Sequence, residues 1–279
     1  ALIPLLVGIV AQSFGWRYGM YASGTLSIVI GIFIFFVLRD TPSTMGLPSI
    51  EKFKNDSDPA LARQDKEISV KDILIKYIFT NGYLWLLGVT YFFVYLIRGA
   101  FSEWTSLYLI ETRNYQLVVA NAAITWFEVG GLVGSLFAGW ASDKIFNGRR
   151  GPVNVLYSLC AVGAIMAFWK LPVSTVLMDY VLVFIIGFLI FGPQMLIGMV
   201  AVEVSHKKAA GGATGFIGFI AYLGMASAGT PLMNICKTMG WDGVFQTLIG
   251  CGIVSVILLL PFWSIKFNPK YSVKEPIKN

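Results

Sequence analysis

An arginine lies within the apolar run FVYLIRGAFSEW, near the middle of a stretch that extends from residue 83 to residue 110. A cation at the centre of a bilayer costs about 2.5–3.5 kcal/mol on insertion scales, so such residues usually face a cavity or a partner. A guanidinium stays charged at neutral pH, and its planar fork of donors fits the oxygens of a carboxylate or a phosphate. Arg98 therefore predicts a site for an anion.

Polar residues continue from Arg98 along one predicted helical face. Tyr91, Tyr95, Arg98, Ser102 and Thr105 follow one another at steps of 4, 3, 4 and 3, which places them on the same side of a helix. A polar stripe on a helix within the membrane is expected to line water.

The next apolar run carries a second deep ionisable group. Asn121, Thr125 and Glu128 share a face at steps of 4 and 3. Glu128 could neutralise Arg98 or accept hydrogen bonds from a ligand, or it could pack against a polar residue of another helix. Arg98 likewise has a structural alternative, an ion pair with Glu103 or Glu128 that holds two helices together.

Two later apolar runs carry residues that bend membrane helices. They contain Gly192–Pro193 and Gly229 with Pro231, and we expect an interruption at each. Tyr222 could contact a ligand or pack in the core. The polar candidates beside these breaks are Tyr222, Asn234 and Gln194.

Other motifs indicate packing and topology. Small residues at four-residue spacing predict a close helix contact; they are Gly130, Gly131, Gly134, Ser135 and Gly139. The segment GWASDKIFNGRRG places Asp143, Arg149 and Arg150 in a tight loop, where a local ion pair is expected.

Membrane-spanning helices must position these side chains. The 279-residue chain has a mean hydropathy of +0.72 and 13% charged residues, whereas a soluble domain carries about 25%. A span needs about 20 apolar residues. We count seven full spans after a short first run; the runs are 1–12, 20–38, 83–110, 118–140, 153–171, 178–202, 212–235 and 244–264.

The basic residues predict the orientation of these spans. Sixteen of the 21 Lys and Arg residues fall in one class of alternating loops and four in the other, and Arg98 lies within a span. The excess marks the cytoplasmic side, which then holds the polar insert 39–80 and the tail 266–279. We interpret 39–80 as a linker between 1–38 and a six-span group at 81–265.

The chain opens with ALIPLLVGIV, without an initiator Met or the features of a signal peptide. We therefore expect it to be the later part of a longer protein. Three cysteines in apolar runs lack metal-ligand or paired spacing and predict packing; they are Cys160, Cys236 and Cys251. The basic residues form no aromatic-interleaved face for nucleic acid, and no nucleophile with a base, metal cluster or cofactor motif indicates an enzyme.

Six motifs resemble, in order and spacing, the organophosphate:phosphate antiporters of the major facilitator superfamily, over about residues 2 to 265. They are RDTPSTMGLPSIEKFKND, FVYLIRGAFSEW, GWASDKIFNGRRG, IIGFLIFGPQMLIG, HKKAAGGATGF and GWDGVF. The stretches ALIPLLVGIVAQSFGWRYGMY and FIAYLG are more similar to the hexose-phosphate uptake and sensing branch than to the glycerol-3-phosphate branch.

The resemblance implies an all-α membrane protein with two six-helix halves, alternating access and no cofactor. This chain would hold the complete C-terminal six-helix bundle at 81–265 and the last one and a half helices of the N-terminal bundle at 1–38, joined by a central cytoplasmic loop at 39–80. In the family, two arginines hold the substrate phosphate, one from the first helix of each half. Arg98 matches the second-half arginine, and the positions matching the rest of the site lining are Tyr95, Glu128 and Tyr222.

The sequence departs from the family pattern at several points. Phe191 stands where some members have a site tyrosine, so one hydroxyl contact is expected to be missing. Lys144 replaces a common arginine, and three residues instead of one precede Gly148. The first-half arginine lies outside the chain, so residues 1–279 alone are not expected to exchange phosphate without the missing N-terminal half as a partner.

The resemblance implies an antiporter in the bacterial inner membrane that exchanges a sugar phosphate, hexose 6-phosphate in this branch, for inorganic phosphate. One alternative is a receptor that senses external sugar phosphate and signals to a membrane histidine kinase. Another is a glycerol-3-phosphate:phosphate antiporter. No metal and no nucleic acid are expected as partners.

Overall fold

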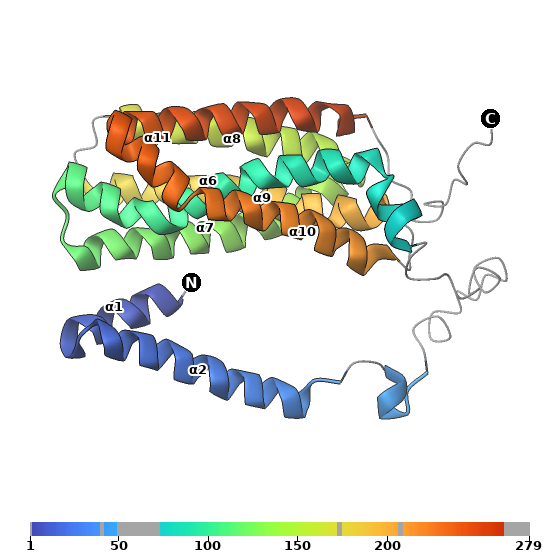
Figure 1. The fold of residues 1–279 in the computed structure, drawn as a ribbon, viewed down its shortest axis with the longest axis horizontal. Coiled ribbons are helices and arrows are strands. Elements are labelled where there is room, and N and C mark those ends of the chain that lie inside the picture. The colour runs from blue at the N-terminus through green and yellow to red at the C-terminus, as the bar shows by residue number, and fades with distance from the viewer. Residues whose placement is uncertain (1, 40–41, 49–72, 172–174, 206–208, 265–279) are drawn as a thin grey trace. The chain divides into compact units, whose positions relative to one another are not determined.

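The computed structural model describes residues 2–39, 42–48, 73–171, 175–205 and 209–264 (Figure 1). The chain divides into two compact units, residues 6–72 and residues 73–279 with 1–5, and each is treated by itself. Much of the predicted 39–80 loop and the 266–279 tail lie outside the described residues.

The first part of the chain forms a helical hairpin. Helix α1 spans Leu2–Phe14 and α2 spans Trp16–Val37, in agreement with the predicted short run and first full span. Gly15 joins them at φ +94°, a backbone region that glycine enters without steric cost. A short 3-10 helix, η1, follows at Pro42–Met45.

The second unit is a bundle of long helices (Figure 1). A π-helix, η2, comes first at Ile73–Phe79, and its Ile78 packs against Gly212. The helices after it are α6 at Gly82–Arg113, α7 at Leu117–Lys144, α8 at Arg150–Lys170, α9 at Val176–Glu203, α10 at Ala210–Ser227 and α11 at Thr230–Leu259, with a terminal 3-10 turn, η4, at Leu260–Phe262. These helices contain the predicted spans, with ends shifted by several residues.

Six stretches of the described chain are long and apolar enough to cross a membrane, and the last runs over 53 residues from Ala210 to Phe262. That last stretch is long enough for two crossings. It bends at residues 228–229, and its helical backbone stops at Gly240, where φ is 67° and ψ is −167°. Figure 1 shows the chain reversing between its orange and red segments. The first crossing is therefore α10 with the start of α11, and the second is the rest of α11, as in the predicted pair 212–235 and 244–264.

The two expected interruptions have different outcomes. A break is present beside Gly229, but α9 continues as a helix through Pro193. The expected interruption at Gly192–Pro193 is therefore wrong. Proline removes one N–H donor, yet the helix is continuous. The neighbouring Gly192 lies so close to the Tyr157 ring that a Cβ would overlap it.

Small residues bring α7 and α9 into close contact, as their spacing predicts. A Cβ added at Gly130 would overlap the carbonyl of Phe184, and one added at Gly134 would overlap the carbonyl of Phe188. On the opposing helix, Gly187 lies equally close to the carbonyl of Phe127. Backbone approach of this kind requires glycine.

The end of α7 and the start of α8 are joined by the predicted ion pair. Arg150 contacts Asp143 at 2.9 Å, and its Nε lies 3.1 Å from Glu203 at the end of α9. Its Nη1 also donates to the hydroxyl of the buried Ser142. One guanidinium thus joins three helices at this end of the bundle.

At the opposite end of these helices, the Tyr115 hydroxyl donates to the buried carboxylate of Asp179 at 2.7 Å. Burial, followed by this hydrogen bond, raises the pKa of Tyr115 to about 12. The pair joins the α6–α7 loop to the first turn of α9.

Candidate functional site

Arg98 lies near the midpoint of α6. The helix has 32 residues, so roughly 23 Å of helix extends on either side of Arg98, whereas half of a hydrocarbon core is about 15 Å. The residue is partly buried. Its guanidinium carbon is 4.6 Å from the ring centroid of Phe191 on α9 and 5.7 Å from that of Tyr95, within the range of a cation–π contact.

The guanidinium has no polar partner among the described residues. Its Nε is buried without a hydrogen bond, and no described carboxylate forms an ion pair with it. Glu103 is exposed, and Glu128 is partly buried on α7. The alternative of a structural ion pair with either glutamate is therefore not formed in the structure.

A group of aromatic and amide side chains is linked to Arg98 through Tyr95 and Phe191. The Tyr91 hydroxyl donates to the backbone carbonyl of Gln194 at 3.0 Å, and the Gln194 Nε2 donates to the Tyr95 hydroxyl at 3.3 Å. The Tyr95 ring contacts the Tyr222 ring of α10 with centroids 5.6 Å apart. We call this group the Arg98 cluster; its members are Tyr91, Tyr95, Arg98, Phe191, Gln194 and Tyr222.

The predicted site residues are only partly brought together. Tyr95 and Tyr222 lie in the Arg98 cluster, and Tyr222 remains 65% exposed. Glu128 makes no hydrogen bond or ion pair within the described residues, and none joins it to Arg98.

The polar stripe on α6 does not line water along its whole length. Thr105 is 4% exposed, and its hydroxyl donates to the carbonyl of Phe101 on the same helix. Tyr91 and Tyr95, at the start of the stripe, are also buried, at 9% and 8% exposed. Of the five predicted positions, Arg98 and Ser102 are the ones that are partly exposed.

Two cluster members have contacts that the sequence did not predict. The Phe191 ring packs against the guanidinium. The sequence indicated only that a hydroxyl is missing at this position, not that the ring would contact Arg98. Gln194 is the single amide in the apolar run from residue 180 to residue 202. Its isolation in the sequence indicated that its amide would contact another polar group.

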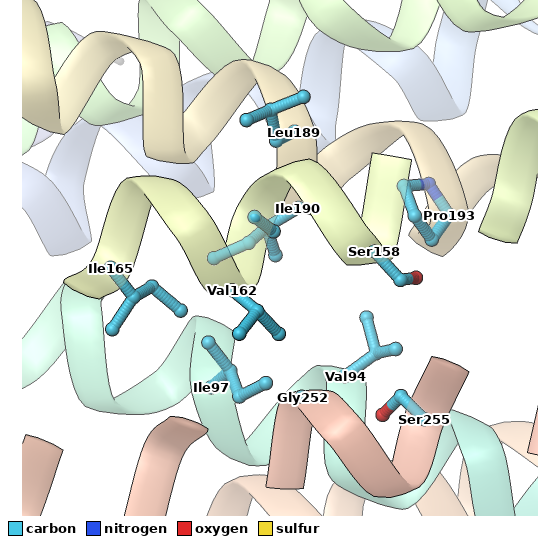
Figure 2. A pocket seen from close by; sticks show the side chains of 11 residues that line it. Val94, Ile97, Ser158, Val162, Ile165, Leu189, Ile190, Pro193, Gly252 and Ser255 are labelled. Carbon is cyan, nitrogen blue, oxygen red and sulfur yellow. The ribbon is translucent and has the colours of Figure 1, made fainter. Parts of the chain in front are cut away.

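A small cavity in the bundle is a different feature from the Arg98 cluster. Figure 2 shows it among α6, α8, α9 and α11, lined by apolar side chains with Ser158 and Ser255 as its hydroxyls. Its volume is about 20 Å³, enough for about one water molecule, whereas ligand pockets start at about 300 Å³. The cavity is therefore too small for an organic ligand.

Within the described ranges, no group of three or more His, Cys, Asp or Glu side chains could hold a metal ion. The cysteines at positions 160, 236 and 251 are free thiols. In this part of the chain, the Arg98 cluster is consequently the arrangement best suited to bind a small charged ligand.

The fold and the cluster define a multi-pass membrane protein of the all-helical class, with a cation suited to anions halfway through a span. The model of the Major Facilitator Superfamily matches residues 1–229. The chain belongs to that superfamily.

Similarity to individual proteins agrees with the branch predicted from the motifs. The chain is 44% identical over 263 residues to the membrane sensor protein UhpC of Escherichia coli strain K12, covering 94% of this chain. It is 44% identical over 275 residues to a probable hexose phosphate transport protein of Chlamydia trachomatis, covering 95% of this chain. A glycerol-3-phosphate transporter of Haemophilus influenzae is 37% identical over 260 residues and covers 87% of this chain. The resemblance to the organophosphate family, and within it to the hexose-phosphate branch, is confirmed.

The chain is shorter than these relatives. It spans 60% of the length of the Escherichia coli and Chlamydia trachomatis proteins and 54% of the Haemophilus influenzae protein.

Proposed function

We propose that this chain forms the second-half bundle of a secondary transporter that exchanges a sugar phosphate for inorganic phosphate by alternating access. The substrate in this proposal is a hexose 6-phosphate, and the membrane is the bacterial inner membrane, with the C-terminus in the cytoplasm. The observation that carries the proposal is Arg98, a partly buried guanidinium at mid-span without a hydrogen bond or ion pair among the described residues.

The chemistry of the cluster fits a phosphate ester. An unpaired guanidinium can bind two phosphate oxygens through parallel charge-assisted hydrogen bonds. Phe191 covers one face of the guanidinium, and the guanidinium N–H groups make no hydrogen bond within the described residues. The exposed Tyr222 hydroxyl and the Glu128 carboxylate would then contact sugar hydroxyls or balance the charge.

A second candidate function is a receptor, because one relative with 44% identity is a membrane sensor protein. A receptor of this kind would bind external sugar phosphate and pass a signal to a histidine kinase. Arg98 would hold the phosphate in either case, so the site alone does not separate the two functions.

Exchange in proteoliposomes tests the proposal. The full-length protein is reconstituted into vesicles loaded with inorganic phosphate, and uptake of labelled hexose 6-phosphate is measured, with glycerol 3-phosphate as a competitor. We expect uptake that requires internal phosphate and is lost in Arg98→Gln. Binding without uptake would favour the receptor, stronger competition by glycerol 3-phosphate would favour the other antiporter branch, and absence of both binding and uptake would refute the anion site.

A further inference from the structure

The amide of Gln194 is held between two tyrosines of the neighbouring helix. Tyr91 donates to its backbone carbonyl at 3.0 Å, and its own Nε2 donates to the Tyr95 hydroxyl at 3.3 Å. The rings of Tyr91 and Tyr95 also pack edge to face with centroids 4.6 Å apart. Both tyrosines are buried, so the three residues form a fixed unit between α6 and α9.

Counting protons shows what this unit does to the Tyr95 hydroxyl. A tyrosine hydroxyl has one proton to donate and can accept on its oxygen. The Tyr91 proton is directed to the Gln194 carbonyl, and the Tyr95 oxygen accepts the amide N–H of Gln194. The two hydroxyl oxygens are 3.5 Å apart, beyond the usual 2.5–3.0 Å of an O–H···O bond. The Tyr95 proton is consequently available to a further acceptor.

Arg98 lies on the same side of α6, one helical turn beyond Tyr95. Its guanidinium carbon is 5.7 Å from the Tyr95 ring centroid. An anion bound to this guanidinium would need further donors for its remaining oxygens, and hydrogen bonds to charged acceptors are stronger than those between neutral groups.

We propose that Gln194 is a positioning residue that fixes the Tyr95 hydroxyl proton toward a phosphate held by Arg98. The inference rests on the proposed function and adds a role for a residue that touches no ligand. Tyr91 contributes by holding Gln194 in place. Without the amide donor, the Tyr95 hydroxyl loses the hydrogen bond that orients it, and its proton is no longer directed to the phosphate.

Variants at positions 194 and 95 test this role in the full-length protein, with binding of labelled inorganic phosphate and hexose 6-phosphate as the measurement. Gln194→Met keeps a similar length but has no N–H donor, and we expect roughly 10- to 100-fold weaker binding, the effect of one hydrogen bond to a charged group. Tyr95→Phe should cause a similar loss. The double variant should bind with an affinity within about threefold of that of Tyr95→Phe, because both changes remove the same interaction.

Gln194→Glu provides a readout that a purely structural role would not change. An ionised carboxylate accepts the Tyr95 proton and turns it away from the ligand, whereas a protonated carboxyl can donate as the amide does. Binding by this variant should therefore recover as the pH falls, with the pH profile of the unsubstituted protein as reference. Gln246→Met, at an exposed position on α11, is the matched control and should bind normally.

The outcomes separate the inference from the proposed function. Normal binding by Arg98→Gln would overturn both. Loss of binding in Arg98→Gln with normal binding in Gln194→Met, or with additive losses in the double variant, would overturn the role of Gln194 alone. A pH profile of Gln194→Glu that matches the unsubstituted protein would do the same.

Discussion

Replacing Arg98 with lysine keeps the charge and removes the planar fork, so it isolates the geometry of the guanidinium. In the structure, no N–H group of Arg98 is used within the described residues, and the group lies 4.6 Å from the centroid of the Phe191 ring. The donors of the guanidinium are therefore unused within the described residues, and one face is already covered.

The size of the expected effect follows from two lost interactions. An ammonium provides a single point of contact, so at least one charge-assisted hydrogen bond is lost, worth about 1.5–3 kcal/mol. The contact with Phe191 weakens by about 0.5–1 kcal/mol. Together these terms give about 2–4 kcal/mol, or roughly 30- to 700-fold weaker binding.

Competition binding of hexose 6-phosphate against labelled inorganic phosphate, on purified full-length protein, measures this loss. Arg149→Lys is the matched control, because Arg149 is exposed in the α7–α8 loop, and its affinity should not change. Binding by Arg98→Lys within threefold of the unsubstituted protein would show that the guanidinium geometry is not used.

Three further predictions concern packing and topology. Gly130→Ala places a Cβ against a carbonyl of α9 and should destabilise the protein by about 1–3 kcal/mol, seen as a lower melting temperature in detergent. Glu203→Gln should lower the melting temperature more than Asp143→Asn, because the Glu203 side chain is 22% exposed and that of Asp143 is 60% exposed, and exposed pairs contribute less than about 1 kcal/mol; equal shifts would contradict this ranking. Single cysteines at Asn147 and Asn114 should react from the cytoplasmic and outer sides respectively, and labelling of both from one side would refute the span count.

The sequence alone predicted the helices well because their apolar runs have the length that a bilayer requires. It also predicted the depth of Arg98 and its proximity to Tyr95, since three-residue spacing on one helix is a local property. The contacts of Phe191 and Gln194 with α6 could not be predicted, because they depend on how α9 is rotated against a helix about 90 residues away in the chain. The continuity of α9 through Pro193 was likewise not predicted.

The backbone at Gly240 determines whether the bundle crosses the membrane an odd or an even number of times. If residues 210–262 formed a single crossing, an odd number of crossings would separate η2 from the chain after Phe262, and the two would emerge on opposite faces of the membrane. The reversal at Gly240 makes the number even. The ring of Tyr83, at the start of α6, accordingly lies 5.9 Å from the ring of Phe262. A reporter fused after residue 262 would then report the same compartment as one inserted before α6, so one glycine torsion decides which compartment a C-terminal tag reports.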